Sequence, residues 1–295
     1  MKCWTSGKTR DTNMNVLKIS GSLEVFSQEK LIRSLYNSGV TDEQLWRVLG
    51  AIEAELYEGI TTVRLFKIVH KYLKKHAFLS ASRYNLKSAI VAFGASFFPF
   101  NFFIGELLKA LGYNVMTDVP IIGKNWTHQI DVVAENKKGH FMIECKFHNQ
   151  PGFKTDTKLP LNIYSRFKDV EYSWRNSQGK RDKFHQGWVV TNGKFTEDAI
   201  HNGEYTGLRM IGWDYPAGSS LKEMISKNGL YPVTCLSSLT NAQKAAFLAK
   251  GVILCQTIYD HPDRLDQFSL GKIKAKRILE EAQGICEIRP SLVSQ

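Results

Sequence analysis

The stretch from Gln129 to His148 constrains the fold most, because two short apolar runs are joined there by a polar turn. The residues Asn136–Gly139 form the turn signal, so the stretch predicts a β-hairpin. Side chains two apart in a strand share a face, so Glu144 and Lys146 point to the same side. The turn brings Asp131 alongside Glu144. The sequence therefore predicts two carboxylates and one ammonium group at the edge of a sheet.

This combination of side chains suits phosphodiester hydrolysis. Two carboxylates can hold a hard divalent cation such as Mg²⁺ or Mn²⁺, which keeps several of its waters. The cation polarises a phosphoryl oxygen and lowers the pKa of the attacking water, and a fixed Lys stabilises developing charge. Asp131 and Glu144 lie in apolar runs, where an unpaired charge is costly. The alternative is an ordinary salt bridge from one carboxylate to Lys146.

The pattern Asp131-x12-Glu144-x-Lys146 resembles the PD-(D/E)XK nucleases, which have the restriction-endonuclease-like fold, and in particular their Mrr-like branch. The phrase VVTNGKFTEDA at 189–199 is similar to the same branch. The resemblance implies a Mg²⁺-dependent endodeoxyribonuclease in which Asp131 and Glu144 hold the metal and Lys146 positions the nucleophile. The backbone carbonyl of Cys145 is a further candidate ligand.

The resemblance also implies a carboxylate from the first helix of the nuclease fold. Glu106 is the matching position, on a short amphipathic helix predicted at 104–111. The alternative is a solvated Glu with no metal role. His128 and His148 flank the hairpin and are interpreted as contacts around the site rather than ligands. Arg166 and Lys168, on a long helix predicted at 159–174, are expected to face outward, where they could follow a phosphate backbone.

Composition agrees with a nucleic-acid partner. The 295 residues carry a net charge of +11, and a basic surface gains from counterion release on DNA. Five scattered cysteines without a C-x-x-C pair argue against a disulfide framework and against a zinc ribbon. Neither an apolar run of membrane length nor a signal peptide is visible, so we expect a cytoplasmic protein.

The segment 14–92 carries the phrases VLKISGSLEVFSQEK, YEGITT and ASRY. It resembles the ATP-cone, a regulatory nucleotide-binding domain, which implies ATP or dATP as a regulatory ligand. The positions that match the family's nucleotide contacts, together with a glycine that permits close backbone approach, are Val16, Lys18, Gly21, Glu24, Lys30 and Thr62. The alternative is a helical scaffold whose lysines are merely solvated.

The alternation of strands and helices predicts an α/β protein in four parts. These are a polar tail at 1–13, the ATP-cone-like domain at 14–92, a restriction-endonuclease-like mixed sheet flanked by helices at 93–215, and a helical region at 216–295. Within the last region, 269–279 loosely resembles half of a helix-hairpin-helix. A basic solvated helix, with a role in oligomerisation, is the favoured interpretation there.

The leading hypothesis is a metal-dependent DNA endonuclease, expected to be a homo-oligomer, whose activity responds to nucleotide bound at 14–92. The alternative is a nucleotide-sensing DNA-binding regulator with a catalytically silent nuclease fold. A nuclease that acts on RNA or on branched junctions would use the same metal site, and the sequence does not choose among these substrates.

Overall fold

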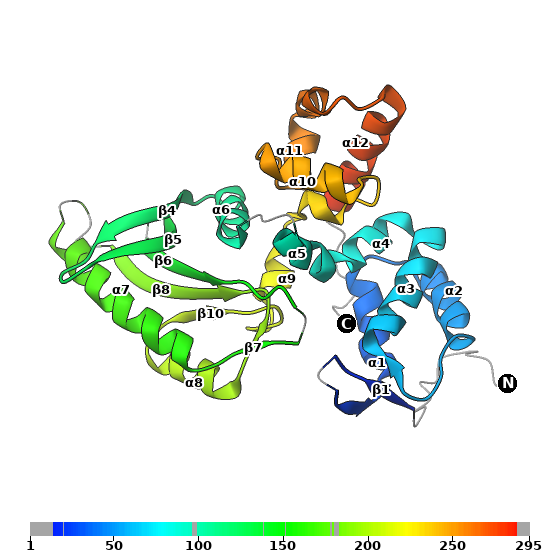
Figure 1. The fold of residues 1–295 in the computed structure, drawn as a ribbon, viewed down its shortest axis with the longest axis horizontal. Coiled ribbons are helices and arrows are strands. Elements are labelled where there is room, and N and C mark those ends of the chain that lie inside the picture. The colour runs from blue at the N-terminus through cyan, green and yellow to red at the C-terminus, as the bar shows by residue number, and fades with distance from the viewer. Residues whose placement is uncertain are drawn as a thin grey trace.

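The computed structural model describes residues 14–287, except 20, 96–98, 138, 151, 178 and 180–182. The polar tail expected at 1–13 lies outside this range. Figure 1 shows three parts: a mostly helical N-terminal part in blue and cyan, a mixed sheet flanked by helices in green, and C-terminal helices in orange and red. The α/β architecture expected from the sequence is confirmed.

The N-terminal part begins with a three-stranded sheet of order β2-β1-β3. Strands β1 (Asn15–Leu17) and β2 (Leu23–Val25) are antiparallel, as expected, and Gly21 between them has a φ of 82° that favours glycine. Strand β3 (Ile60–Thr61) pairs in parallel with β1. The sequence did not indicate β3, because two residues carry too little periodicity to predict a strand.

Four helices complete this part: α1 (Gln28–Asn37), α2 (Asp42–Glu53), α3 (Thr62–His76) and α4 (Phe78–Tyr84). The expected capping box at α2 is present, since Thr41 accepts from the backbone of Gln44 and Gln44 accepts from the backbone of Thr41. The N-cap of α3 is Thr61, whose hydroxyl accepts from the backbone N–H of Arg64 at 3.1 Å. Thr62 is therefore the first residue of the helix.

The chain from 78 to 95 forms two helices and not one continuous helix. Helix α4 ends at Tyr84, and α5 (Leu86–Ala95) begins after Asn85. The break separates two environments: Ala81 packs in the N-terminal core, whereas Ile90 and Phe93 pack in the core beneath the central sheet. Tertiary packing decides this boundary, which local pattern alone could not locate.

The central sheet has the strand order β10-β8-β6-β5-β4. Its first three strands in the chain are antiparallel, and β8 and β10 then join in parallel. The strands are β4 (Asn114–Ile122), β5 (Thr127–Glu135), β6 (Gly139–Lys146), β8 (Phe184–Thr191) and β10 (Arg209–Ile211). The hairpin expected from the sequence is thus β5 and β6, in the middle of the sheet. A small pair, β7 (Lys154–Thr155) and β9 (Lys194–Phe195), lies outside it.

Helices cover both faces of this sheet (Figure 1). Helix α6 (Phe100–Ala110) packs on one face, and its residues share a core with Val132 and Ile143. Helices α7 (Lys158–Asn176) and α8 (Glu197–Tyr205) cover the other face, where Val133 and Met142 are buried. The alternation of side chains along β5 and β6 therefore feeds two separate cores.

The C-terminal region is helical, as expected. Its elements are α9 (Leu221–Lys227), the short 3₁₀ helix η1 (Val233–Cys235), α10 (Asn241–Ala249), α11 (Cys255–Asp260), the 3₁₀ helix η2 (Pro262–Phe268) and α12 (Lys272–Cys286). Buried residues of these helices belong to the same core as α5, α6 and one face of the sheet. Among the residues described, no helix is both long and apolar enough to cross a membrane.

Two buried polar side chains, Arg83 and Glu281, join α4 to α12, although the bonded residues are about 200 positions apart in the sequence. The carboxyl group of Glu281, 1% exposed, accepts from Ser82 Oγ at 2.7 Å and from the backbone N–H groups of Ser237 and Ser238 at 2.6 and 2.9 Å. Arg83 donates to the carbonyls of Gly284 and Ile285 at the end of α12. These bonds tie the N-terminal part to the C-terminal helices.

We predict that Glu281→Ala lowers the free energy of unfolding by about 3 kcal/mol, because it leaves several buried donors without an acceptor. Urea denaturation measures this effect. Glu280→Ala is the matched control, since Glu280 is the adjacent residue and its side chain is 64% exposed. Equal stability of the two variants would contradict the prediction.

Candidate active site

The site lies where strands β5 and β6 part. Their ladder runs from the pair Glu135 and His140 to the pair Val132 and Ile143, and there it stops. Beyond this point a side chain takes over: Asp131 Oδ2 accepts the backbone N–H of Cys145 at 2.7 Å. A carboxylate thus occupies the position of a ladder carbonyl. The bond holds it at a fixed place between two strands.

Strand β6 continues past the divergence because its other neighbour supports it. Its parallel pairing with β8 extends to Lys146 opposite Thr191. Glu144 therefore lies on a strand that is paired with β8 on one side and no longer paired with β5 on the other. Its side chain is only 20% exposed.

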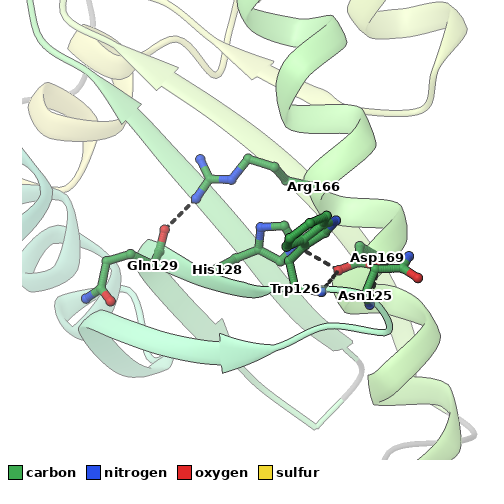
Figure 2. Close-up of polar contacts among 6 residues, drawn as sticks. All are labelled: Asn125, Trp126, His128, Gln129, Arg166 and Asp169. Carbon is green, nitrogen blue, oxygen red and sulfur yellow. Dashed lines mark hydrogen bonds and ion pairs between the residues drawn. The ribbon is translucent and has the colours of Figure 1, made fainter.

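Arg166 on α7 binds Glu144 directly, with Nη1 2.8 Å from Oε2. Its Nη2 donates to the backbone carbonyl of Gln129, as Figure 2 shows. The expectation that Arg166 faces outward is wrong: α7 packs across the sheet so that this residue meets the hairpin. The partner of Glu144 is thus Arg166, and not Lys146 as the salt-bridge alternative required. Lys168, two residues after Arg166 on the same helix, forms an ion pair with Glu171 at 2.5 Å.

Burial and mutual repulsion shift both carboxylates in the same direction. Burial, followed by the charge of Asp131, raises the pKa of Glu144 from 4.5 to about 7, although Arg166 and Lys146 oppose the shift. Burial also raises the pKa of Asp131, against the hydrogen bond from Cys145 and the charge of Arg166. The pair therefore has more negative charge than its surroundings compensate. Such a site favours a proton or a cation.

Lys146 is exposed and lies two residues beyond Glu144 on β6. Its charge lowers the pKa of Glu144 and also that of His148, so it stands near both groups. The predicted set of Asp131, Glu144 and Lys146 is thus gathered at one end of the hairpin.

Glu106 is placed differently. It lies on α6, which covers the sheet face of Val132 and Ile143, whereas Arg166 reaches Glu144 from α7 on the other face. The carboxylate of Glu106 is paired with Lys109 at 2.7 Å. The structure does not bring it to the carboxylate pair, and its metal role stays a prediction.

Asp118 on β4 is a carboxylate that sequence reasoning missed. The β4–β5 register pairs Thr117 with Val132 and Val119 with Ile130, and it skips the position between them, which Asp118 and Asp131 occupy. Asp118 has a φ of 56°, which is strained for a residue other than glycine. The charge of Asp118 raises the pKa of Asp131. No sequence pattern indicates this neighbour, because only the β4–β5 register places Asp118 beside Asp131.

The two histidines that flank the hairpin have structural partners. His128 Nε2 lies 2.8 Å from Asp169 Oδ2 on α7 (Figure 2). His148 Nε2 lies 3.0 Å from Thr155 Oγ1. The side chain of Asn192 accepts from the backbone N–H of His148 at 2.7 Å and donates to its carbonyl at 2.8 Å. In this way Asn192, in the VVTNG phrase, extends the β6–β8 pairing beyond the strand ends.

The expected nucleotide residues form a separate cluster in the N-terminal part. Lys18 and Lys30 both pair with Glu24, and these bonds lower the pKa of Glu24 to about 2. Val16 is buried in the same strand pair, and Thr62 begins α3. The structure therefore brings the two lysines together around one carboxylate.

A divalent metal fits the donor set at the hairpin. The available groups are carboxylate oxygens and backbone carbonyls, which Mg²⁺ and Mn²⁺ prefer to nitrogen or sulfur. Among the residues described, no three His, Cys, Asp or Glu side chains cluster as a metal cage. Two carboxylates with water and phosphate oxygens are nevertheless the usual coordination of Mg²⁺ in phosphate chemistry.

The part of the chain that contains this site matches a known family. Residues 99–192 match a family described as "Nuclease-related domain", and residues 231–286 match "AF1548-like, C-terminal". A protein of Archaeoglobus fulgidus, named "Uncharacterized protein", is 31% identical over 183 residues, which are 62% of this chain and 99% of that protein. The chain belongs to the AF1548-like family. A solved structure titled "Crystal Structure of Protein of Unknown Function AF1548" is also 31% identical, with a TM-score of 0.51 over 63% of this chain and 96% of the solved chain.

The matched nuclease-related domain contains Asp131, Glu144, Lys146 and Arg166. The expectation of a nuclease-like domain in this AF1548-like chain is confirmed at that level. Neither matched range includes a residue before 99, so the ATP-cone resemblance of residues 14–92 stays a prediction.

We predict that Glu144→Gln stabilises the metal-free protein at pH 8 by about 2 kcal/mol, because it removes a buried charge. Between pH 4.5 and about 7 the folded wild type keeps a proton that the unfolded chain has lost. The wild-type free energy of unfolding therefore falls as pH rises through that window, and the advantage of the variant shrinks toward pH 5.

Urea denaturation in EDTA at pH 5 and pH 8 measures the difference. Glu197→Gln, an exposed position at the start of α8, is the control. A difference that is equal at the two pH values would exclude a raised pKa for Glu144.

Proposed function

We propose that this chain is a metal-dependent DNA endonuclease of the Mrr-like restriction type. The observation that supports this proposal most is the Asp131–Glu144 pair, two partly buried carboxylates with raised pKa values where β5 and β6 diverge. The ion pair with Arg166 offsets only part of this effect, because the pKa of Glu144 stays raised in its presence. Raised values at adjacent sites in a nuclease-related domain point to a functional role.

In this proposal Asp131 and Glu144 would hold Mg²⁺ or Mn²⁺, and the bound ion would supply a lowered pKa for the attacking water and positive charge at the phosphate. The bond from Cys145 N–H orients Asp131, so that one carboxylate oxygen is fixed and the other is available. Arg166 is a positioning residue: its two donors join Glu144 to the backbone of Gln129 and thereby fix the distance between the strands. Lys146, exposed beside Glu144, stabilises charge on the phosphate or positions the water.

A nucleic-acid substrate is favoured because the chain carries a net charge of +11, and DNA is the substrate that the Mrr-like resemblance implies. The alternative, a DNA-binding regulator with a silent nuclease fold, needs a site that does not bind metal. The uncompensated charge of the carboxylate pair argues against it. RNA and branched junctions remain possible substrates of the same chemistry.

We predict that Asp131→Ala and Glu144→Ala each reduce Mg²⁺-dependent cleavage of supercoiled plasmid at least about a thousandfold, since each removes a metal ligand. Lys146→Ala should reduce it about a hundredfold or more through loss of charge stabilisation. Plasmid nicking, with Mg²⁺ or EDTA, measures the rates. Glu197→Ala is the control and should retain the wild-type rate.

DNA binding without metal should be largely kept in these variants. Cleavage that survives Glu144→Ala would remove this carboxylate from the mechanism. Salt-sensitive binding without any cleavage of unmodified, methylated, branched or RNA substrates would favour the regulator.

We further propose that the N-terminal part binds ATP or dATP and thereby controls the oligomeric state or the access of DNA to the site. Lys18 and Lys30 lie together at Glu24, and a triphosphate would compete with Glu24 for both ammonium groups. The turn at Gly21 lets a ligand approach the backbone closely.

We predict that Lys18→Ala and Lys30→Ala each weaken ATP or dATP binding about tenfold, the effect of one lost charge-assisted contact. Isothermal titration calorimetry measures the dissociation constant. Lys67→Ala, an exposed lysine on α3, is the matched control. Binding that is equal in all variants, or absent in the wild type, would contradict the nucleotide proposal.

A further inference from the structure

The turn between β4 and β5, residues Gly123–Trp126, presents one of the most exposed large side chains of the described protein. Trp126 is 73% exposed, and Ile122 just before the turn is 74% exposed. The exposed indole at this hairpin tip does not contribute to the hydrophobic core. Large exposed aromatic groups of this kind mark interaction sites when the backbone beneath them is fixed.

The backbone beneath Trp126 is fixed by one carboxylate. Asp169 on α7 accepts from the backbone N–H of Asn125 at 2.9 Å, from Asn125 Nδ2 at 2.7 Å and from the backbone N–H of Trp126 at 3.3 Å. Its Oδ2 also lies 2.8 Å from His128 Nε2. These groups converge on Asp169 in Figure 2. The carboxylate is 9% exposed, so its own charge is largely hidden from a ligand at the tip.

The turn sequence is adapted to this arrangement. The backbone N–H of Lys124 donates to the carbonyl of Asp169 at 3.1 Å, and that of Gly123 donates to Trp126 O at 2.7 Å. A Cβ atom at Gly123 would lie 2.0 Å from Asp169 Oδ2, so a side chain there would displace the carboxylate. The tip is therefore a rigid support and not a loose loop.

The same helix carries the tip and the carboxylate pair. Arg166 holds Glu144 and Gln129, and Asp169, one turn later, holds Asn125 and Trp126 (Figure 2). Trp126 is five residues from Asp131 along the chain, or about 16 Å at the rise of an extended strand. The position of the indole relative to the site is thus set by α7.

The surface around Trp126 combines aromatic and basic groups. The Lys124 Nζ lies 4.7 Å from the ring centre of Tyr172, and Tyr172 is 51% exposed. Surfaces that bind single-stranded nucleic acid interleave aromatic rings, on which bases stack, with cations that attract the backbone. Since Asp169 is enclosed, Trp126, Lys124 and Tyr172 present exposed aromatic surface and positive charge without a competing exposed carboxylate of the support.

We infer that Trp126 is a base-stacking residue that holds an unpaired nucleotide on the α7 side of the sheet, about 16 Å along β5 from the carboxylate pair. The substrate class is a nucleic acid with a single-stranded segment or a splayed end. Lys124 contacts the nucleic-acid backbone, and Tyr172 contacts a neighbouring base. The inference rests on the proposed nuclease function for its biological meaning, but the binding itself does not need metal or cleavage.

The test is binding of the full chain to fluorescent oligonucleotides in EDTA, followed by anisotropy. The probes are a single-stranded DNA 20-mer, the same sequence as a blunt hairpin-closed duplex, and the duplex with a single-stranded overhang. Trp126→Ala should weaken binding of the single strand and of the overhang about tenfold, with less than about a twofold change for the closed duplex. Trp126→Phe, which keeps a ring, should restore most of the affinity.

Trp46→Ala is the matched control, because Trp46 is 46% exposed on α2 in the N-terminal part. It should bind all probes as the wild type does. Unchanged binding of every probe by Trp126→Ala, or an equal loss on all three probes, would overturn the stacking role. This binding test does not depend on the nuclease proposal. If the wild type cleaves nothing with Mg²⁺ but Trp126→Ala still binds the single strand more weakly than Trp46→Ala, the nuclease proposal fails and the stacking role stands.

Discussion

The hydrogen bond from Cys145 N–H to Asp131 Oδ2 determines the rest of the site. In a continuous antiparallel ladder this N–H would bond to a backbone carbonyl of β5. A side-chain acceptor allows the two strands to separate without leaving a buried donor unpaired. The separation makes room beside Glu144, in the middle of the five-stranded sheet. The site is thus a local interruption of the sheet that a single carboxylate compensates.

Helix α7 stabilises the open end. Where β5 leaves β6, Arg166 bridges Glu144 to the carbonyl of Gln129, and one turn later Asp169 binds the β4–β5 turn. Other residues of α7, among them Ile163, Phe167 and Val170, share a core with Val133 and Met142. The helix therefore has two functions: its apolar residues form the core, and its two charged residues bind the strands at the open end. A rigid frame of this kind suits a site whose carboxylates repel each other.

The sequence predicted the parts of the site that depend on local pattern. Alternation and the polar turn located the hairpin, and a spacing of two placed Glu144 and Lys146 together. Three features could not be found in this way. Arg166 was expected to face outward, because helical periodicity gives a face but not the angle at which the helix crosses the sheet. Asp118 is near Asp131 only through the β4–β5 register, and the Asp169 contacts join positions more than forty apart. The break at Asn85 likewise depends on two different cores.

The hydrogen bonds between α4 and α12 are the connection between the N-terminal part and the C-terminal helices. Arg83 and Glu281 are buried at this seam, and Gly284 on α12 packs so closely on Leu79 that a Cβ atom would lie 2.6 Å from Leu79 Cδ1. Close packing of this kind transmits displacement, because neither helix can shift without breaking buried hydrogen bonds. The C-terminal helices in turn share one core with α6 and with Val132 and Ile143, the last residues of the β5–β6 ladder. Continuous packing therefore joins α4, through α12 and the C-terminal helices, to the strands at the point where they begin to separate.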